Sequence, residues 1–289
     1  MYKIIVLVKQ VPDTRAVGKD AMKADGTVNR AALPAIFNPE DLNALEMAFS
    51  VKDAFPGSTV TVLTMGPIRA AEILRESLYR GADAGVLLTD KAFAGSDTLA
   101  TSYALSCAVK KIGEFDIIFG GRQAIDGDTA QVGPQVAEKL GLPQVTYAEK
   151  IVDVKDKTIR VVRRLDRGVE TIEAQMPLVI TVNGTAPECR PRNAKRVMKY
   201  KKAKTVSEMH SASDDYITLQ NEKPYLNITE WGAINVDPEI DQLGLKGSPT
   251  KVKQVQNIVF QAKDSKTLTN DDEQIEDLMK ELIDNHTLG

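Results

Sequence analysis

The sequence predicts an α/β fold: a doubly wound parallel sheet with helices on both faces, an antiparallel β extension and a C-terminal arm with a terminal helix. Three observations predict it. Short apolar, β-branched runs, typical of strands buried on both faces, alternate with helical stretches of about 10–15 residues. After Pro143 apolar and polar residues alternate, as in half-buried antiparallel strands. Near the end of the chain, apolar residues recur at helical spacing.

The first half of the chain supplies the parallel sheet. Residues 3–8, KIIVLV, predict a buried strand. Asn38 and Pro39 predict the start of a helix, because Asn caps helices and Pro suits their first position. The elements that follow are a strand at 58–64, a helix at 68–79, a strand at 85–89, a helix capped by Ser96 and Asp97 that ends near 112, a strand at 115–119 and a helix at 129–140.

The second half changes character. Its predicted elements are antiparallel strands at 145–154, 158–164 and 170–173, a buried strand at 178–182 and a final helix at about 270–285. Regular structure weakens from about residue 185, and residues 195–204, KRVMKYKKAK, carry a cluster of positive charge.

Composition excludes several classes of protein. The chain has 289 residues with 43% hydrophobic and 27% charged residues, typical of a globular protein, and a net charge of −3 indicates no nucleic-acid partner. No apolar run approaches the roughly 18 residues of a membrane span, and no signal peptide is evident, so a cytoplasmic protein is expected. Cys107 and Cys189 form no metal-binding or disulfide pattern, and no metal site is expected.

Recognisable motifs for acid–base or nucleophilic catalysis are also missing. The sequence contains no nucleotide-binding G-x-G-x-x-G or P-loop pattern and no hydrolase motif. Its two histidines, His210 and His286, fall in a polar stretch and near the end of the chain. We therefore predict no catalytic residue in this chain.

The most informative segment is the glycine-rich loop at 119–134, FGGRQAIDGDTAQVGP. It follows a buried strand and precedes a helix, so it lies at the carboxyl edge of the sheet, where doubly wound folds bind ligands. Main-chain N–H groups at the expected helix start, from Thr129 to Val132, suit a phosphate. Arg122 and Gln123 are placed to bind ribose, phosphate or an adenine edge. The alternative is a helix without a ligand, capped by Asp128 and Gln131.

Two further segments end strands at the same edge. Lys9 follows the first strand, and Met65 ends the second. The convergence of three strand ends favours a ligand site over a merely capped helix.

These motifs resemble the beta subunits of electron-transfer flavoproteins over about residues 1–200. The resemblance rests on VLVKQVPD near the start, FNPEDLNALEMA (37–48), TMGP (64–67), RGADAG (80–85), GRQAIDGDTAQVGP and VRRLDRGVETIEAQMPLVIT (162–181). Arg167 departs from the family, which usually has Gly or an acid there.

The resemblance implies a heterodimer with an alpha subunit that carries FAD. It also implies a second nucleotide in this chain, which is AMP in housekeeping members and FAD in electron-bifurcating members. In the latter NADH reduces the FAD, and the electrons part towards ferredoxin and the alpha-subunit flavin. The spelling DGDTAQVGP resembles the bifurcating branch, so FAD is favoured, with AMP as the alternative.

Carried onto this sequence, the family's nucleotide contacts form one set of residues. They are Leu7, Lys9, Asn38, Met65, Gly121, Arg122, Gln123, Ala124, Ile125, Asp126, Gly127, Asp128, Thr129, Ala130, Gln131 and Val132.

The resemblance also divides the chain into three parts. Residues 1–185 form the nucleotide-binding α/β domain, 186–204 a partner-recognition loop and basic arm, and 205–289 a C-terminal arm that packs on the alpha subunit. The loop implies docking on an acyl-CoA dehydrogenase or another flavin dehydrogenase, although Ala194 stands where the family has an anchoring Leu. A stand-alone ATP- or AMP-binding domain is the rival from another class, and a scaffold subunit is a third interpretation.

Overall fold

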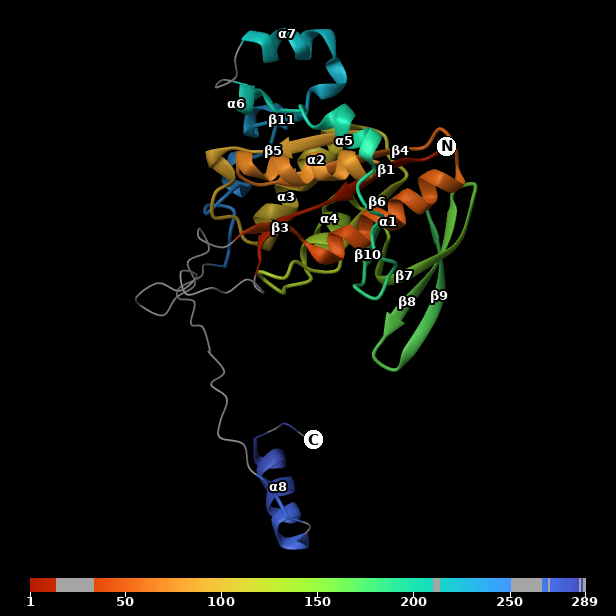
Figure 1. Ribbon diagram of the computed structural model, residues 1–289, viewed down its shortest axis with the longest axis vertical. Helices are drawn as coiled ribbons and strands as arrows, with labels where there is room; N and C mark the ends of the chain where they lie inside the picture. Colours follow the sequence, from red (N-terminus) through yellow and green to blue (C-terminus); the bar gives the residue numbers. More distant parts are fainter. Residues whose placement is uncertain (14–33, 210–213, 251–266, 270, 286, 288–289) are drawn as a thin grey trace.

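A nine-stranded sheet forms the centre of the molecule, in the order β11-β5-β4-β1-β6-β10-β7-β8-β9. The computed structural model describes residues 1–13, 34–209, 214–250, 267–269, 271–285 and 287. Figure 1 shows this sheet with helices packed against it. The α/β class predicted from the sequence is confirmed.

The central strands are parallel and buried. Their bounds are β1 Lys3–Leu7, β4 Thr59–Met65, β5 Ala84–Leu88, β6 Ile117–Gly121 and β10 Leu178–Val182. All neighbouring pairs among them run parallel. From β1 the chain proceeds to β4 and β5 on one side and then crosses to β6 and β10 on the other, so the winding reverses beside β1.

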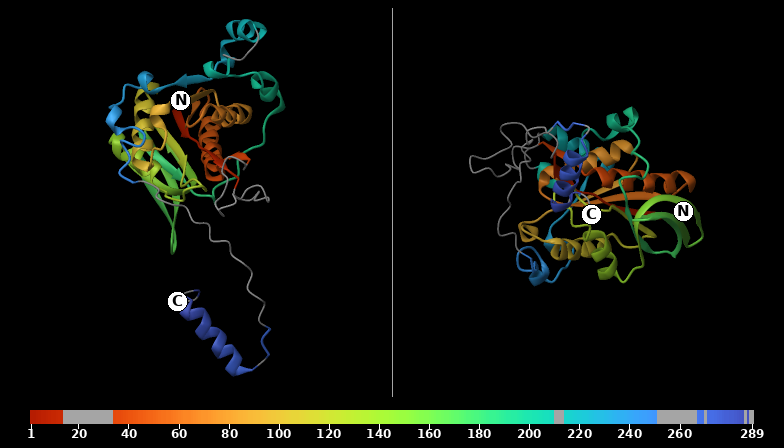
Figure 2. Two further views of the ribbon diagram at one scale, coloured as in Figure 1. Left: turned by 90° about the vertical axis from the view of Figure 1, so that its left-hand side faces the viewer. Right: turned by 90° about the horizontal axis from the view of Figure 1, so that it is seen from below.

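Helices cover both faces of this sheet, as Figure 2 shows. They are α1 Pro39–Ala54, α2 Ala71–Arg80, α3 Thr98–Ile112 and α4 Val132–Leu140. Ile4 and Val6 point to the core under α1 and α2. Ile5 and Leu7 alternate with them and point to the core under α3 and α4. Alternate side chains of β1 thus pack into two separate cores, one on each face of the sheet, which is the physical basis of double winding.

The antiparallel extension follows α4. Strand β7 Gln144–Lys155 pairs parallel with β10, and β8 Thr158–Leu165 and β9 Gly168–Gln175 then add antiparallel. A small separate pair, β2 Gln10–Pro12 and β3 Ala35–Phe37, follows β1 and precedes α1.

Helix α4 begins three residues later than predicted. Asp128 and Ala130 have φ angles of 47° and 52°, in the left-handed region that a right-handed helix excludes. The helix starts at Val132, and no side chain caps it. The predicted capping box of Asp128 and Gln131 is therefore wrong, and both side chains serve other contacts described below.

Residues after 185 contain more regular structure than the pattern indicated. The helices are α5 Ala194–Tyr200, α6 Val206–Met209 and α7 Asp214–Glu222, and strand β11 Thr229–Trp231 pairs parallel with β5. Leu226 and Ile228 beside β11 are buried in the same core as α2. Short 3-10 helices lie at Ile68–Ala70, Lys91–Phe93, Pro224–Leu226, Ala233–Asn235 and Ile240–Gln242.

The predicted terminal helix is present as α8 Asp272–Asp284. Figure 1 shows it apart from the sheet, and none of its described residues is buried. None of the helices in the described part of the chain combines the length and the apolar character needed to span a membrane. His210 and His286 lie outside the described residues.

Candidate functional site

A cavity of about 400 Å³ opens at the carboxyl ends of β1, β4 and β6. The strand register places Leu7 beside Leu63 on β4 and beside Gly120 on β6, so the three strand ends are level. This is the point where the winding of the sheet reverses, and open α/β sheets bind ligands there. The volume falls in the range of small-molecule sites, about 300–1,000 Å³.

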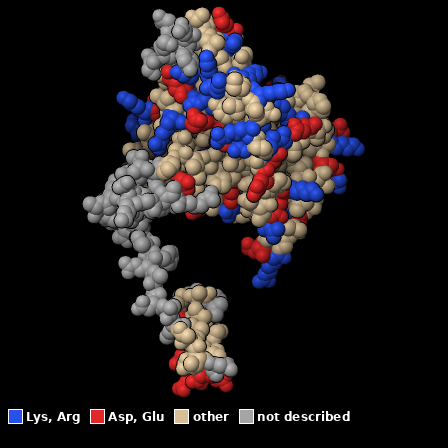
Figure 3. Space-filling model, in the orientation of Figure 1, with Lys and Arg blue, Asp and Glu red and all other residues tan. Residues whose placement is uncertain are grey.

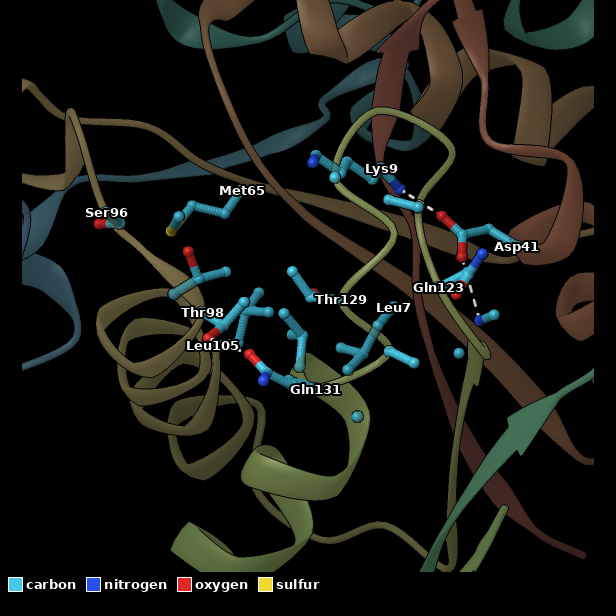
Figure 4. A pocket seen from close by; sticks show the side chains of 18 of the residues that line it. Leu7, Lys9, Asp41, Met65, Ser96, Thr98, Leu105, Gln123, Thr129 and Gln131 are labelled. Atoms are coloured by element: carbon cyan, nitrogen blue, oxygen red, sulfur yellow. Dashed lines mark hydrogen bonds between the residues drawn. The ribbon is translucent and has the colours of Figure 1, made fainter. Parts of the chain in front are cut away.

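One wall of the cavity is formed by large apolar side chains, and polar residues contribute to the rest of its lining. The apolar side chains are Leu7, Leu63, Met65, Phe93 and Leu105. Figure 4 shows Thr98 and Leu105 on α3 facing Thr129 and Gln131 of the glycine-rich loop. The Thr98 hydroxyl donates to Gln131 Oε1 at 2.8 Å, which joins the α3 side of the cavity to the start of α4.

Most residues predicted from the sequence line this cavity. They are Leu7, Lys9, Met65, Gly121, Arg122, Gln123, Ala124, Gly127, Asp128, Thr129, Ala130, Gln131 and Val132. Asn38, Ile125 and Asp126 are not part of the lining.

Asn38 instead supports the loop from behind. Its side chain is fully buried. Its Nδ2 donates to the carbonyl of Gln123 at 2.9 Å, and its Oδ1 accepts from the N–H of Ile125 at 3.2 Å. The neighbouring Glu40 accepts from the N–H of Gln123 at 2.9 Å and pairs with Arg122 at 2.9 Å. The first turn of α1 therefore positions the main chain that follows β6.

Asp41 lies on the same first turn of α1, and it also lines the cavity. Its two carboxylate oxygens accept from the N–H of Lys9 at 2.7 Å and from the N–H of Gly121 at 3.0 Å. Figure 4 shows both bonds. Burial raises the pKa of Asp41 to about 7, although hydrogen bonds and the nearby Lys9 charge act in the opposite direction.

Sequence reasoning missed Asp41 and the wall formed by residues 93–98. Phe93, Gly95, Ser96, Asp97 and Thr98 all line the cavity. The sequence offers a signal for this wall, because Ser96 and Asp97 predict a helix cap after a strand. A cap at the carboxyl edge of a parallel sheet is also a candidate for the ligand site.

The cations of the site are already paired. Lys9 Nζ lies 2.7 Å from a carboxylate oxygen of Asp126, which is not part of the lining. Arg122 pairs with Glu40 and lies 5.6 Å from the centre of the Tyr147 ring. Main-chain N–H groups are therefore the donors left for an anion in this cavity.

The N–H groups expected to face a phosphate, from Thr129 to Val132, donate to no main-chain carbonyl of the described residues. Those of the preceding Gly127 and Asp128 donate to the carbonyl of Ala124. The first turn of α4 starts at Val132, and its N–H groups at Val132 and Gly133 have no acceptor within the helix. The Asp128 carboxylate accepts from Gln123 Nε2 at 2.8 Å.

Comparisons with known proteins identify the family of this chain. The family model described as electron transfer flavoprotein domain matches residues 25–210. The chain is 45% identical to the electron transfer flavoprotein subunit beta of Clostridium acetobutylicum, over 86% of each chain. The chain belongs to the electron transfer flavoprotein family, as a beta subunit. The resemblance stated from its motifs is confirmed.

Other relatives of this beta subunit carry names of reductase complexes. It is 42% identical to the acryloyl-CoA reductase electron transfer subunit gamma of Anaerotignum propionicum, over 99% of this chain and 100% of that protein. It is 43% identical to the caffeyl-CoA reductase-Etf complex subunit CarD of Acetobacterium woodii, over 86% of each chain.

The basic arm of this beta subunit is bound to its own α/β body. Arg190 pairs with Glu46 and Asp53 on α1, each at 2.8 Å. Arg196 donates to the carbonyl of Leu78 at 2.7 Å. Figure 3 shows Lys and Arg interspersed with acidic side chains on this face of the molecule. Met198 remains 65% exposed.

Proposed function

We propose that this chain is the beta subunit of an electron-bifurcating heterodimer, and that its cavity binds a second FAD besides that of the alpha subunit. NADH is the proposed electron donor, and ferredoxin and the alpha-subunit FAD are the proposed acceptors. An acyl-CoA dehydrogenase or reductase, or a similar flavin dehydrogenase, is the proposed partner. FAD supplies the redox chemistry when bound, and this chain supplies binding, orientation and electrostatics.

The observation that carries this proposal is the cavity at the switch point of the sheet. Its apolar wall suits the flat ring of an adenine or a flavin, and the polar groups around it suit ribose and phosphate. The lining also contains three acids, Asp41, Asp97 and Asp128, which do not attract an anion. Main-chain N–H donors must therefore favour the phosphate.

Gly133 supports the phosphate part of the proposal. A Cβ at Gly133 would lie 2.4 Å from the methyl group of Thr181 on β10, so only glycine lets the first turn of α4 lie this close to the strand. We propose that the N–H groups of Val132 and Gly133 bind the diphosphate, because a helix start presents free donors and partial positive charge. Arg122 and Gln123 would then lie beside the ribityl or ring portion.

The preference for FAD over AMP is supported by the loop spelling DGDTAQVGP and by the relatives named for acryloyl-CoA and caffeyl-CoA reductase complexes. AMP in the same cavity is the alternative, with a purely structural role. Both share the adenylate group, so both fit the apolar wall and the start of α4.

Counting released nucleotides tests the proposal. The chain is co-expressed with its alpha subunit, purified, denatured, and the released cofactors are identified by absorbance and mass spectrometry. We expect two FAD per heterodimer. One FAD with one AMP contradicts the bifurcating assignment, and one FAD with no further nucleotide contradicts nucleotide binding by this chain.

Pairing with an alpha subunit separates this proposal from the stand-alone ATP- or AMP-binding domain. We propose that residues 186–204 contact the dehydrogenase and that the C-terminal arm packs on the alpha subunit. Co-expression should give a yellow heterodimer with NADH-dependent flavin reduction. A colourless homodimer or monomer that does not bind the alpha subunit contradicts the heterodimer. A heterodimer with two FAD that shows no NADH-dependent reduction contradicts NADH as the donor.

A further inference from the structure

Asp41 is a buried carboxylate in the wall of the cavity. Its side chain sits on the first turn of α1, and the residue is 6% exposed. Each of its oxygens accepts one main-chain N–H, from Lys9 after β1 and from Gly121 at the end of β6. A carboxyl group suits two N–H donors, whereas an Asn amide would turn its own N–H₂ towards one of them.

The charges that face Asp41 do not neutralise an incoming anion. Lys9 faces it from the end of β1, but its ammonium group pairs with Asp126 at 2.7 Å. Arg122 lies after β6 and pairs with Glu40 at 2.9 Å. These are the two cations among the described lining residues, and both already have carboxylate partners.

Asp97 in the lining remains suited to carry its charge. Burial acts to raise the pKa of Asp97, but hydrogen bonds from Thr250 and from the N–H groups of Ala100 and Leu99 outweigh it, and the net pKa is lowered. Asp128 is exposed to solvent. The charge of Asp41, in contrast to that of Asp97, is disfavoured by its surroundings, because burial raises its pKa to about 7.

Nucleotide binding would disfavour that charge further. A phosphate brings negative charge into the same cavity and displaces water, and both effects favour a protonated carboxyl group. The protonated group keeps acceptor capacity for the two N–H groups and gains one O–H donor for the ligand. Protonation therefore removes a repulsion without dismantling the hydrogen bonds that join the two strand ends.

We propose that binding of an adenine nucleotide in this cavity is coupled to the uptake of one proton by Asp41. This inference rests on the proposed nucleotide site. It makes Asp41 a positioning residue whose protonation state is linked to occupancy. The chemistry of the ligand that matters is its phosphate, which AMP and FAD share.

Calorimetry of the full-length chain, freed of nucleotide, tests the coupling. AMP and FAD are titrated separately at pH 8 in buffers of different ionisation enthalpy, which yields the number of protons taken up. This pH lies above the second ionisation of a phosphate monoester, near 6, so AMP itself does not titrate. We expect uptake of more than about half a proton per nucleotide, and an affinity that falls about tenfold between pH 7.5 and 8.5.

Matched Asp→Asn substitutions assign the proton. In Asp41→Asn the uptake and the pH dependence should disappear, with affinities within about twofold from pH 7.5 to 8.5. Asp53→Asn, on the same helix but paired with Arg190 away from the cavity, should behave as the unmodified chain. Asp128→Asn removes an exposed lining charge and should keep the proton uptake, whatever its effect on affinity.

The outcomes are distinguishable. Nucleotide binding with less than about half a proton taken up overturns the coupling and leaves the nucleotide site intact. Uptake that persists in a folded Asp41→Asn variant overturns the assignment to Asp41. Failure of the unmodified chain to bind AMP or FAD at any pH overturns both the coupling and the nucleotide site. If Asp41→Asn does not fold, the proton count of the unmodified chain still decides the coupling.

Discussion

At the residue scale, the site depends on a close contact between Gly121 and Asp41. The N–H of Gly121 donates to Asp41, and a Cβ on Gly121 would lie 2.4 Å from the accepting oxygen and 2.9 Å from the main-chain N of Asp41. Glycine is required here because there is no room for a Cβ atom, and not because the backbone has a positive φ angle. The pair joins the end of β6 to the first turn of α1 and thereby places the loop that lines the cavity.

We expect Gly121→Ala to destabilise the protein by about 1–3 kcal/mol, as overpacking of a tight site does. The added methyl group meets main-chain atoms of α1 that cannot move independently. Thermal or urea unfolding of the nucleotide-free chain measures the loss. Gly127→Ala is the matched control, because nothing lies within 4 Å of its added Cβ. Equal stability of the two variants would contradict the close contact.

The raised pKa of Asp41 predicts a pH dependence of stability. The folded chain holds this proton up to about pH 7, whereas the unfolded chain releases it near 3.8. Between these values the folded state binds more protons, so the free energy of unfolding falls as pH rises, by up to about 1.4 kcal/mol per pH unit from this group.

Unfolding of Asp41→Asn and of the unmodified chain at several pH values checks this sign. The stability of the variant relative to the unmodified chain should increase from pH 5 to pH 7. Asp53→Asn controls for loss of an acid elsewhere on α1. A relative stability that stays constant or decreases over this range would contradict a protonated Asp41 in the folded chain.

At the element scale, the start of α3 connects the cavity to the C-terminal segment. Asp97 caps α3 by accepting from the N–H groups of Leu99 and Ala100, each at 3.0 Å. The same carboxylate accepts from the hydroxyl of Thr250 at 2.7 Å, and the N–H of Asp97 donates to Ser248 at 2.9 Å. Residues that come after β11 therefore help to hold one wall of the site.

We expect Asp97→Ala to lower the free energy of unfolding by about 1–3 kcal/mol, since it removes a cap of about 0.5–2 kcal/mol and the bonds to Thr250. Nucleotide affinity should fall with it, because the wall at 96–98 loses support. Thermal unfolding and AMP titration measure the two effects. Asp271→Ala removes the corresponding cap of α8, whose residues are not buried, and should leave the main unfolding transition unchanged.

At the scale of the whole molecule, the chain combines a packed α/β body with a helix that contributes nothing to its core. Along one side of α8, Ile275, Met279 and Ile283 are 43%, 44% and 54% exposed. These three apolar residues recur at helical spacing. The ion pair between Lys280 and Glu276 is also exposed to solvent. An amphipathic helix whose apolar side is not buried by the described part of its own chain is suited to pack on another subunit.

We expect the triple substitution of Ile275, Met279 and Ile283 by Ser to weaken the heterodimer at least tenfold, which corresponds to about 1.4 kcal/mol. The melting temperature of the isolated chain should not change, because these side chains lie outside its core. Co-purification with the alpha subunit and a binding titration measure the effect. Substitution of Glu276 and Lys280 by Gln is the control, and a triple variant with unchanged binding contradicts a role for α8 in the interface.

Much of this architecture follows from the sequence, because it depends on local periodicity. The apolar run at 3–8, the cap at Asn38 and the alternation after Pro143 each act over a few residues, and the structure contains all the strands and main helices that they predict. The sequence also predicts that the glycine-rich loop lies at the cavity, because a loop that follows a buried parallel strand lies at the carboxyl edge of the sheet.

Tertiary structure alone decided which polar groups face the cavity and which face the protein. Asn38 and Asp41 stand on the same helical turn, yet Asn38 bonds to the back of the loop and Asp41 lines the cavity. The left-handed residues that delay α4, and the pairing of β11 with β5, likewise have no local signature. The contacts of Asn38 and Asp41 and the pairing of β11 with β5 join residues that are distant in sequence. Such contacts are selected by packing and cannot be inferred from local periodicity.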